Sequence, residues 1–276
     1  MMNELSKPAR LAPLHAPGRR EPVESRPPAV GILDQRLLGR LVVVSPHLDD
    51  AVLSLGATLA HAVESGANVE VLTVFACDPS SATPTDDWER KAGFATEGAA
   101  AQQRRIEDRS ACRVLGVTPR WFDFSAHPYA RRESMEEVVS AVVAATAGAD
   151  TVLIPGFPLE HADHASLTHA LLSHGLRCRN LGLYAEQPYS FDLRTTPNGP
   201  IPAMPAASVR SGAFTWRRAC AQRRHRQLKL RAVQQYQSQL RLLGLRQRGL
   251  GYLRLHRMLW QEARLGGETI AWPNAT

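Results

Sequence analysis

The chain has 276 residues, of which 44% are hydrophobic and 21% are charged, and its formal net charge at pH 7 is +7. No apolar run has the length of a membrane-spanning helix, and the N-terminus lacks the apolar middle of a secretory signal. The four cysteines show no Cys-x-x-Cys spacing, so a cysteine metal site is not indicated. We therefore expect a cytoplasmic protein with free thiols and no stable membrane insertion.

The N-terminal region differs in composition from the rest. Residues 1–35 contain six prolines among several arginines, a composition that buries too little apolar surface to become ordered. We predict a flexible arm over residues 1–35 and a single domain over residues 36–276, because this length can bury a full core in one domain.

The first chemically informative segment lies between a predicted strand and a predicted helix. Residues 41–44 are a short β-branched run typical of a buried parallel strand, and residues 51–64 have apolar positions at helical spacing. Between them lie His47, Asp49 and Asp50. One aspartate could simply cap the helix, but a cap explains neither the second aspartate nor the histidine. Ligands bind at such strand-to-helix junctions in α/β sheets, so these residues indicate a metal or catalytic site.

Strand-like and helix-like segments then alternate. We predict strands near residues 69–75 and 121–124, and helices near residues 98–115 and 133–145. This βαβ rhythm is typical of a parallel sheet. The predicted fold is α/β, a Rossmann-like three-layer sandwich with a mostly parallel sheet and helices on both faces.

A second polar segment follows another predicted strand. Residues 151–154 form a buried run, residues 155–158 are expected to be its exit loop, and His161, Asp163 and His164 lead into a helical pattern. Catalytic zinc usually takes three protein ligands and leaves one position for water. The two segments together can supply two histidines and one aspartate, with a second aspartate and a second histidine left for proton transfer. This set suits a metal-dependent hydrolase.

The pair Pro-His-Leu-Asp-Asp and His-Ala-Asp-His resembles the motifs of the zinc-dependent PIG-L (LmbE-like) de-N-acetylase family. Weaker similarity lies in Arg105-x-Glu107, in Glu186-x-Pro-Tyr189 and in the segment from Lys229 to Gln239, so the resemblance covers roughly residues 40–240. Leu48 replaces the family's usual Pro and Ala51 replaces a common Glu, which bears on subfamily and substrate more than on chemistry.

The resemblance implies a role for each polar residue of the two motifs and one Zn²⁺ per chain, although two histidines and one aspartate also accept other divalent metals. The second ring proton of a histidine would be accepted by a carboxylate that orients the ring. The implied metal ligands are His47, Asp50 and His164, the general base is Asp49, the group that stabilises the tetrahedral intermediate is His161, and the orienting carboxylate is Asp163.

The resemblance also implies the substrate: an N-acetylglucosamine-like amino sugar of a small-molecule glycoside or natural product, which loses an N-acetyl or N-acyl group. The loop of residues 76–99 would border the pocket, with Trp88 as a stacking face and Arg105 as a hydroxyl or phosphate contact. Tyr189 could face the substrate from residues 186–214. Trp88 and Tyr189 could equally be packing residues. The alternative function is a catalytically silent carbohydrate-binding or regulatory protein of the same fold.

The C-terminal part is strongly basic, and five arginines lie between residues 217 and 226. Leu228, Val233, Tyr236 and Leu240 can form one apolar helix stripe, which would leave the basic residues on the solvated face. Interleaved aromatic residues that could stack on bases are missing, so we expect no nucleic-acid partner. A helix over residues 250–265 could pack on the core or on a second subunit, and the oligomeric state is left open.

Overall fold

The structure is a computed structural model, and it describes residues 33–127, 129, 131–192, 213–219, 221–245, 250–264 and 267–274. The predicted N-terminal arm lies outside these residues, except for residues 33–35. The described chain begins with a short 3₁₀-helix, Gln35–Leu37, whose Leu37 side chain is buried.

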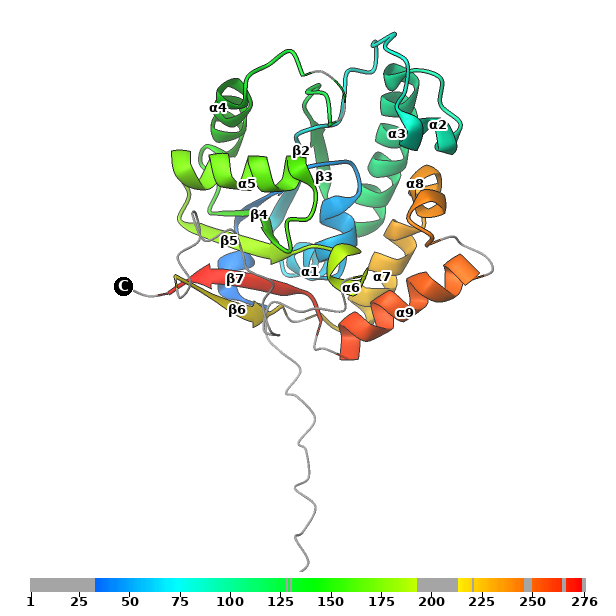
Figure 1. Cartoon of the computed structure of the whole chain (residues 1–276). Coiled ribbons are helices and arrows are strands. Elements are labelled where there is room, and N and C mark those ends of the chain that lie inside the picture. Colours follow the sequence, from blue (N-terminus) through cyan, green and yellow to red (C-terminus); the bar gives the residue numbers. More distant parts are fainter. Residues whose placement is uncertain are drawn as a thin grey trace, which may run out of the picture.

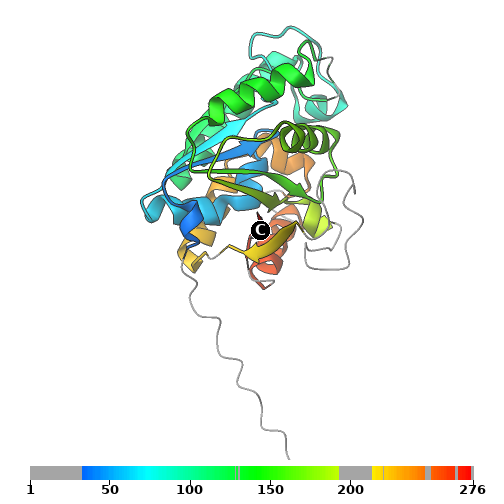
Figure 2. The same cartoon turned by 90° about the vertical axis from the view of Figure 1, so that its left-hand side faces the viewer.

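The centre of the fold is a seven-stranded sheet with the strand order β3-β2-β1-β4-β5-β7-β6 among the described residues. Strands β3, β2, β1, β4 and β5 are parallel, whereas β7 and β6 are added antiparallel at one edge (Figures 1 and 2). The predicted mostly parallel sheet is confirmed. The strands are β1 (Arg40–Ser45), β2 (Asn68–Thr73), β3 (Thr118–Trp121), β4 (Thr151–Phe157), β5 (Asn180–Ala185), β6 (Phe214–Arg218) and β7 (Thr269–Pro273).

Helices cover both faces of the sheet, as predicted. Side chains alternate along β1, so Leu41 and Val43 belong to one apolar cluster, while Val42 and Val44 belong to the other. The first cluster includes α1, α3, α7 and α9, and the second includes α4 and α5, which lie on the opposite side in Figure 1. The helices are α1 (Asp50–Glu64), α2 (Asp87–Ala92), α3 (Glu97–Leu115), α4 (Met135–Thr146), α5 (Ala162–His174), α6 (Tyr189–Asp192), α7 (Arg223–Val233), α8 (Gln237–Leu242) and α9 (Leu250–Arg264).

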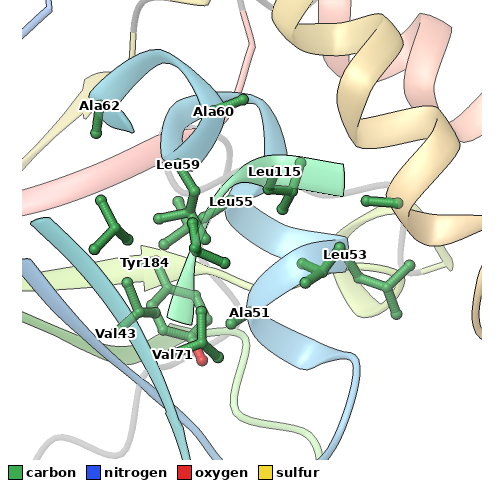
Figure 3. Packing of buried hydrophobic residues seen from close by; sticks show 14 of the residues in the cluster. Val43, Ala51, Leu53, Leu55, Leu59, Ala60, Ala62, Val71, Leu115 and Tyr184 are labelled. Carbon is green, nitrogen blue, oxygen red and sulfur yellow. The ribbon is translucent and has the colours of Figure 1, made fainter. Parts of the chain in front are cut away.

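The contact of α1 with the sheet fixes the position of the first polar motif. Leu55 and Leu59 of α1 lie against Tyr184 of β5 and Val43 of β1 (Figure 3), and all four side chains are buried. The Tyr184 hydroxyl donates a hydrogen bond to the Val44 carbonyl oxygen at 3.0 Å. Because α1 begins directly after the loop from β1, this packing holds the start of the helix at the carboxyl end of the sheet.

Two predicted strand boundaries are wrong. The strand expected near residues 121–124 is β3, which ends at Trp121, because its pairing with β2 runs only from Glu70 and Thr118 to Thr73 and Trp121. The segment of residues 155–158, expected to be a loop, continues β4 to Phe157 through a register shift against β5. The rule that a proline ends a strand fails here because a bulge accommodates the irregularity.

The basic C-terminal region folds as two helices, α7 and α8, and its apolar residues Val233, Tyr236 and Leu240 are buried as expected. Lys229 does not lie on the solvated face, since its side chain is buried. Helix α9 packs on this chain's own core through Leu255. Among the described residues, every helix falls short of the length and apolarity needed to cross a membrane.

Candidate active site

The two polar motifs meet at the carboxyl ends of adjacent parallel strands. Strand β1 pairs with β4, and β4 pairs with β5, so the chain leaves the sheet at three neighbouring points of one edge. The loop after β1 carries His47, the loop after β4 carries His161, and Glu186 follows β5 directly. The topology therefore gathers residues that are far apart in the sequence, as open α/β sheets do at their ligand sites.

Three atoms form a tight triangle in this cluster. His164 Nε2 lies 3.0 Å from His47 Nδ1 and 3.1 Å from Asp50 Oδ2, and the third side, from His47 Nδ1 to Asp50 Oδ2, is 3.4 Å. A tetrahedral zinc ion with bonds of about 2.0–2.1 Å holds its ligand atoms about 3.3 Å apart. The spacing and the donor types therefore fit a zinc ion bound by these three residues.

Each histidine of the triangle has its other ring nitrogen on a carboxylate. His47 Nε2 lies 3.1 Å from Asp163 Oδ2, and His164 Nδ1 is hydrogen-bonded to Glu186. These contacts direct one ring nitrogen of each histidine at a carboxylate, so His47 Nδ1 and His164 Nε2 are the nitrogens that would bind a metal. Asp163 is held in turn by Arg131 at 2.6 Å and by the backbone N–H of His127 at 2.8 Å.

Sequence reasoning gave Glu186 no role. Its carboxylate is buried, and besides His164 it accepts the backbone N–H of Leu159 at 3.0 Å. Burial raises the pKa of Glu186, although the charge of His164 opposes the shift. The available signal was the place of Glu186 in the Glu186-x-Pro-Tyr189 segment, which is weakly similar to the family.

His161 lies beside the triangle. Its ring forms an edge contact with His47 at 4.7 Å, and a ring nitrogen of each of His47, His161 and His164 falls within 4.8 Å of the others. His161 Nδ1 accepts the backbone N–H of Asp163 at 3.2 Å, so the proton of the neutral ring is on Nε2. Burial and then the charges of His47 and His164 lower the pKa of His161 to about 4. This histidine is neutral at pH 7 and can donate one hydrogen bond.

Asp49 has an unusual backbone. Its φ is 112°, in the left-handed region that non-glycine residues rarely adopt, and such strain clusters at functional sites. It is the N-cap of α1 by position, but its side chain makes no capping hydrogen bond, while Asp50 Oδ2 accepts the backbone N–H of His47 at 2.8 Å. Helix capping therefore accounts for neither carboxylate. Burial and then the adjacent charge of Asp50 raise the pKa of Asp49 to about 8.

A cavity of about 420 Å³ opens beside these residues. It borders the acidic pair and His161, and its outer wall is formed by α2, α8 and the segments around residues 127 and 189. Trp88 and Tyr189, both expected to contact the substrate, line it. The described lining is His47, Asp49, Asp50, Leu53, Cys77, Asp86, Trp88, Glu89, Arg104, Ala126, His127, Tyr129, His161, Pro188, Tyr189, Gln239 and Leu243.

The arginine that borders the cavity is Arg104, the neighbour of the expected Arg105. Arg105 points elsewhere: its guanidinium donates to the Cys77 carbonyl oxygen at 2.5 Å and to Asp123 at 2.6 Å. Arg104 pairs with Glu89 at 2.7 Å and donates to the Leu48 carbonyl oxygen at 3.0 Å. Adjacent residues of a helix point about 100° apart, and the helix pattern did not decide which arginine of α3 faces the cavity.

Trp88 is fixed by a contact between α2 and α8. Its indole N–H donates to Gln239 Oε1 at 2.9 Å, and the residue is 41% exposed. Buried Tyr236 donates its hydroxyl proton to Asp108 at 2.6 Å, and Ser238 donates to Glu107 at 2.7 Å. The weak similarity noted around residues 229–239 thus corresponds to a segment that holds the cavity wall in place.

The chain is similar in sequence to known deacetylases. The sequence profile of the GlcNAc-PI de-N-acetylase (PIG-L) family matches residues 42–174. A curated relative, the 2'-N-acetylparomamine deacetylase of Streptomyces fradiae, is 34% identical over 154 residues, which is 50% of this chain and 50% of the relative. The aligned part therefore spans about half the length of that protein.

Two solved structures cover more of the chain. The zinc-inhibited form of teicoplanin deacetylase has a TM-score of 0.63 and 27% identity, with 85% of this chain and 97% of that chain covered. The A40926 pseudoaglycone deacetylase has a TM-score of 0.64 and 25% identity, with 85% of this chain and 96% of that chain covered. Both polar motifs lie inside residues 42–174, the part of the chain that matches the PIG-L family profile.

Proposed function

We propose that this protein is a zinc-dependent hydrolase that removes an N-acetyl group from an amino sugar of a small-molecule glycoside or natural product. The single observation that carries the proposal is the triangle of His47 Nδ1, Asp50 Oδ2 and His164 Nε2, with sides of 3.0 to 3.4 Å, beside a cavity. Similarity to deacetylases of natural products supports the same reaction.

In this proposal His47, Asp50 and His164 hold the metal. Bound zinc would lower the pKa of a water molecule and polarise the amide carbonyl. It would also compensate the negative charge of Asp50, which together with burial raises the pKa of Asp49. Asp49, which lines the cavity, takes a proton from the attacking water as its oxygen bonds to the carbonyl carbon. The same proton then passes to the amine nitrogen as the C–N bond breaks, so acetate and a free amino sugar leave.

His161 acts in its neutral form. Its Nε2–H donates a hydrogen bond to the carbonyl oxygen, which gains negative charge in the tetrahedral intermediate. Protonation of the leaving amine is assigned to Asp49, because in this proposal Asp49 already holds the proton taken from the attacking water. Asp163 and Glu186 position the two histidines of the triangle and do not touch the substrate.

The test is metal analysis of the purified protein combined with acetate release from 2'-N-acetylparomamine and from N-acetylglucosaminides, before and after chelation. We expect one zinc per chain, acetate release, and loss of both on chelation. A protein that binds zinc and sugar but releases no acetate from any of these compounds is the silent carbohydrate-binding alternative. A protein that binds no metal contradicts the proposal outright.

The third metal ligand is tested separately, because His161 also lies near the triangle. Asp50→Ala and His161→Ala are compared for zinc content after equilibrium dialysis. We expect Asp50→Ala to lose zinc and His161→Ala to retain it. The reverse result would move the ligand role from Asp50 to His161.

A further inference from the structure

The charge of the cavity lining differs from that of the whole chain. The chain carries a formal charge of +7, yet the cavity is bordered by the carboxylates of Asp49, Asp50, Asp86 and Glu89, and Arg104 is the one arginine or lysine among its described lining residues. Asp49 and Asp50 belong to the proposed metal site. The two remaining carboxylates lie on the outer wall, away from the proposed chemistry.

Those two carboxylates are not equivalent. Glu89 is buried and forms an ion pair with Arg104 at 2.7 Å, so its charge is compensated within the wall. Asp86 Oδ1 accepts the backbone N–H of Glu89 at 2.8 Å as the N-cap of α2, and no ion pair to Asp86 occurs within the described ranges. Asp86 is therefore the carboxylate of the outer wall whose charge is not neutralised by an arginine or lysine of the described chain.

The surroundings of Asp86 suit a cation. Trp88 and Tyr129 line the same cavity, and aromatic rings attract cations at their faces. The Asp86 backbone N–H donates to the Tyr129 hydroxyl at 3.0 Å, which ties the loop to the cavity wall. A carboxylate held by its own helix cap keeps a second oxygen for a ligand, and a hydrogen bond between an ammonium group and a carboxylate is charge-assisted.

We propose that Asp86 binds an ammonium group of the substrate, and that it selects amino sugars with free amino groups in addition to the N-acetyl group. This inference rests on the proposed function of the same cavity. It makes Asp86 a specificity residue: a polycationic aminoglycoside-type compound is bound in preference to a neutral acetylated glycoside of the same size.

The test compares Asp86→Asn with Asp87→Asn. Asparagine is as good an N-cap as aspartate, so Asp86→Asn keeps α2 while it removes the charge. Asp87 is the matched control, because it is the next residue of the same helix, 85% of its side chain is exposed, and it pairs with Arg90 outside the cavity lining. Circular dichroism of both variants verifies the fold.

The first measurement is calorimetric binding of paromamine and of fully N-acetylated paromamine to zinc-loaded Asp49→Asn, because the wild type would hydrolyse the acetylated compound. We expect Asp49→Asn to bind paromamine more tightly than the neutral derivative. Adding Asp86→Asn should weaken paromamine binding about tenfold or more, whereas adding Asp87→Asn should change it by no more than about twofold. Equal affinity of Asp49→Asn for both compounds, or equal effects of the two added substitutions, would overturn the inference.

The second measurement is the ratio of kcat/KM for 2'-N-acetylparomamine to that for the fully N-acetylated compound, which shares its scissile amide. We expect this ratio to fall about tenfold in Asp86→Asn and to stay constant in Asp87→Asn. An unchanged ratio with active enzyme refutes the role of Asp86 and leaves the proposed function intact. Paromamine binding that depends on Asp86 without any acetate release refutes the proposed function and leaves the cation site intact.

Discussion

Two buried clusters of charged residues contact α1, one at its start and one at its middle, and they differ in how their charges are balanced. At the start of α1, Asp50 is surrounded by His47, His164 and a backbone N–H, beside an open cavity. Behind the middle of α1 lies the ion cluster, which we define as Lys229, Glu262 and Glu268.

The ion cluster is complete in itself. Lys229 Nζ lies 2.8 Å from Glu262 and 2.7 Å from Glu268, and Glu268 also accepts the backbone N–H groups of Ala57 and Thr58 of α1. The cluster ties α7 and α9 to α1 at a close approach, since a Cβ on Gly56 would lie 2.9 Å from Lys229 Cγ. Burial raises the pKa of Glu262 to about 7, against the charge of Lys229.

The difference separates a structural cluster from a functional one. In the ion cluster the cation is Lys229, a residue of the chain itself, and it pairs with the carboxylates of Glu262 and Glu268. In the candidate active site two histidine nitrogens and a carboxylate oxygen converge within 3.4 Å, a set of ligand atoms that suits a bound metal ion. Both clusters are buried, so burial does not distinguish them. The candidate active site differs because its ligand atoms point at one another and a cavity lies beside them.

The largest expected effect comes from Asp49→Asn. Asparagine tolerates the positive φ of this position but cannot accept a proton, so we expect kcat to fall by about 10² to 10⁴ while zinc content is unchanged. Steady-state acetate release and metal analysis measure the two effects. An Asp49→Asn enzyme with a near-normal kcat would remove Asp49 from the role of base.

In the ion cluster, Lys229→Met is the corresponding substitution. It leaves two buried carboxylates without their cation, so we expect the free energy of unfolding to fall by about 3–5 kcal/mol in urea denaturation. Arg231→Met is the control, because Arg231 is exposed on the same helix. A Lys229→Met protein as stable as this control would show that the cluster does not stabilise the fold.

Glu186→Gln is expected to act on the metal site without touching the metal. The amide keeps the size of the side chain but is a weaker acceptor for His164 Nδ1–H, so we expect zinc affinity to fall about 10- to 100-fold in competition with a chelating dye. Glu160→Gln, an exposed residue of the neighbouring loop, should keep wild-type affinity. Unchanged affinity in Glu186→Gln would limit Glu186 to packing.

Glu262→Gln is expected to have the smallest effect. Because the pKa of Glu262 is raised to about 7, this group is mostly protonated at pH 6, and a neutral amide should change the free energy of unfolding by about 1 kcal/mol or less.

The raised pKa of Glu262 also predicts how its contribution to the free energy of unfolding changes with pH. A folded-state pKa above the unfolded value of 4.5 means that the folded state binds more protons between pH 4.5 and 7, so the contribution of Glu262 to stability is lost as pH rises through about 7. Urea denaturation should show Glu262→Gln gaining stability relative to the wild type from pH 5 to pH 8. A constant difference across that range contradicts the raised pKa.

Much of the fold follows from local pattern. The β-branched runs became β1, β2 and β4, and the apolar spacing of residues 51–64 became α1 almost to the residue. The antiparallel addition of β7 and β6 was not foreseen. Strand pairing between residues about 90 positions apart depends on contacts that leave no local signature.

The sequence by itself determined the chemistry available to this protein: two histidine- and aspartate-containing motifs, each directly after a strand, in the order typical of the PIG-L family. Only the tertiary structure decided which atoms meet. The adjacency of β1, β4 and β5 brought Glu186 to His164, the packing of α3 turned Arg104 and not Arg105 to the cavity, and burial placed Lys229 inside the protein. These outcomes depend on the relative orientation of whole elements, which residue spacing along the chain does not encode.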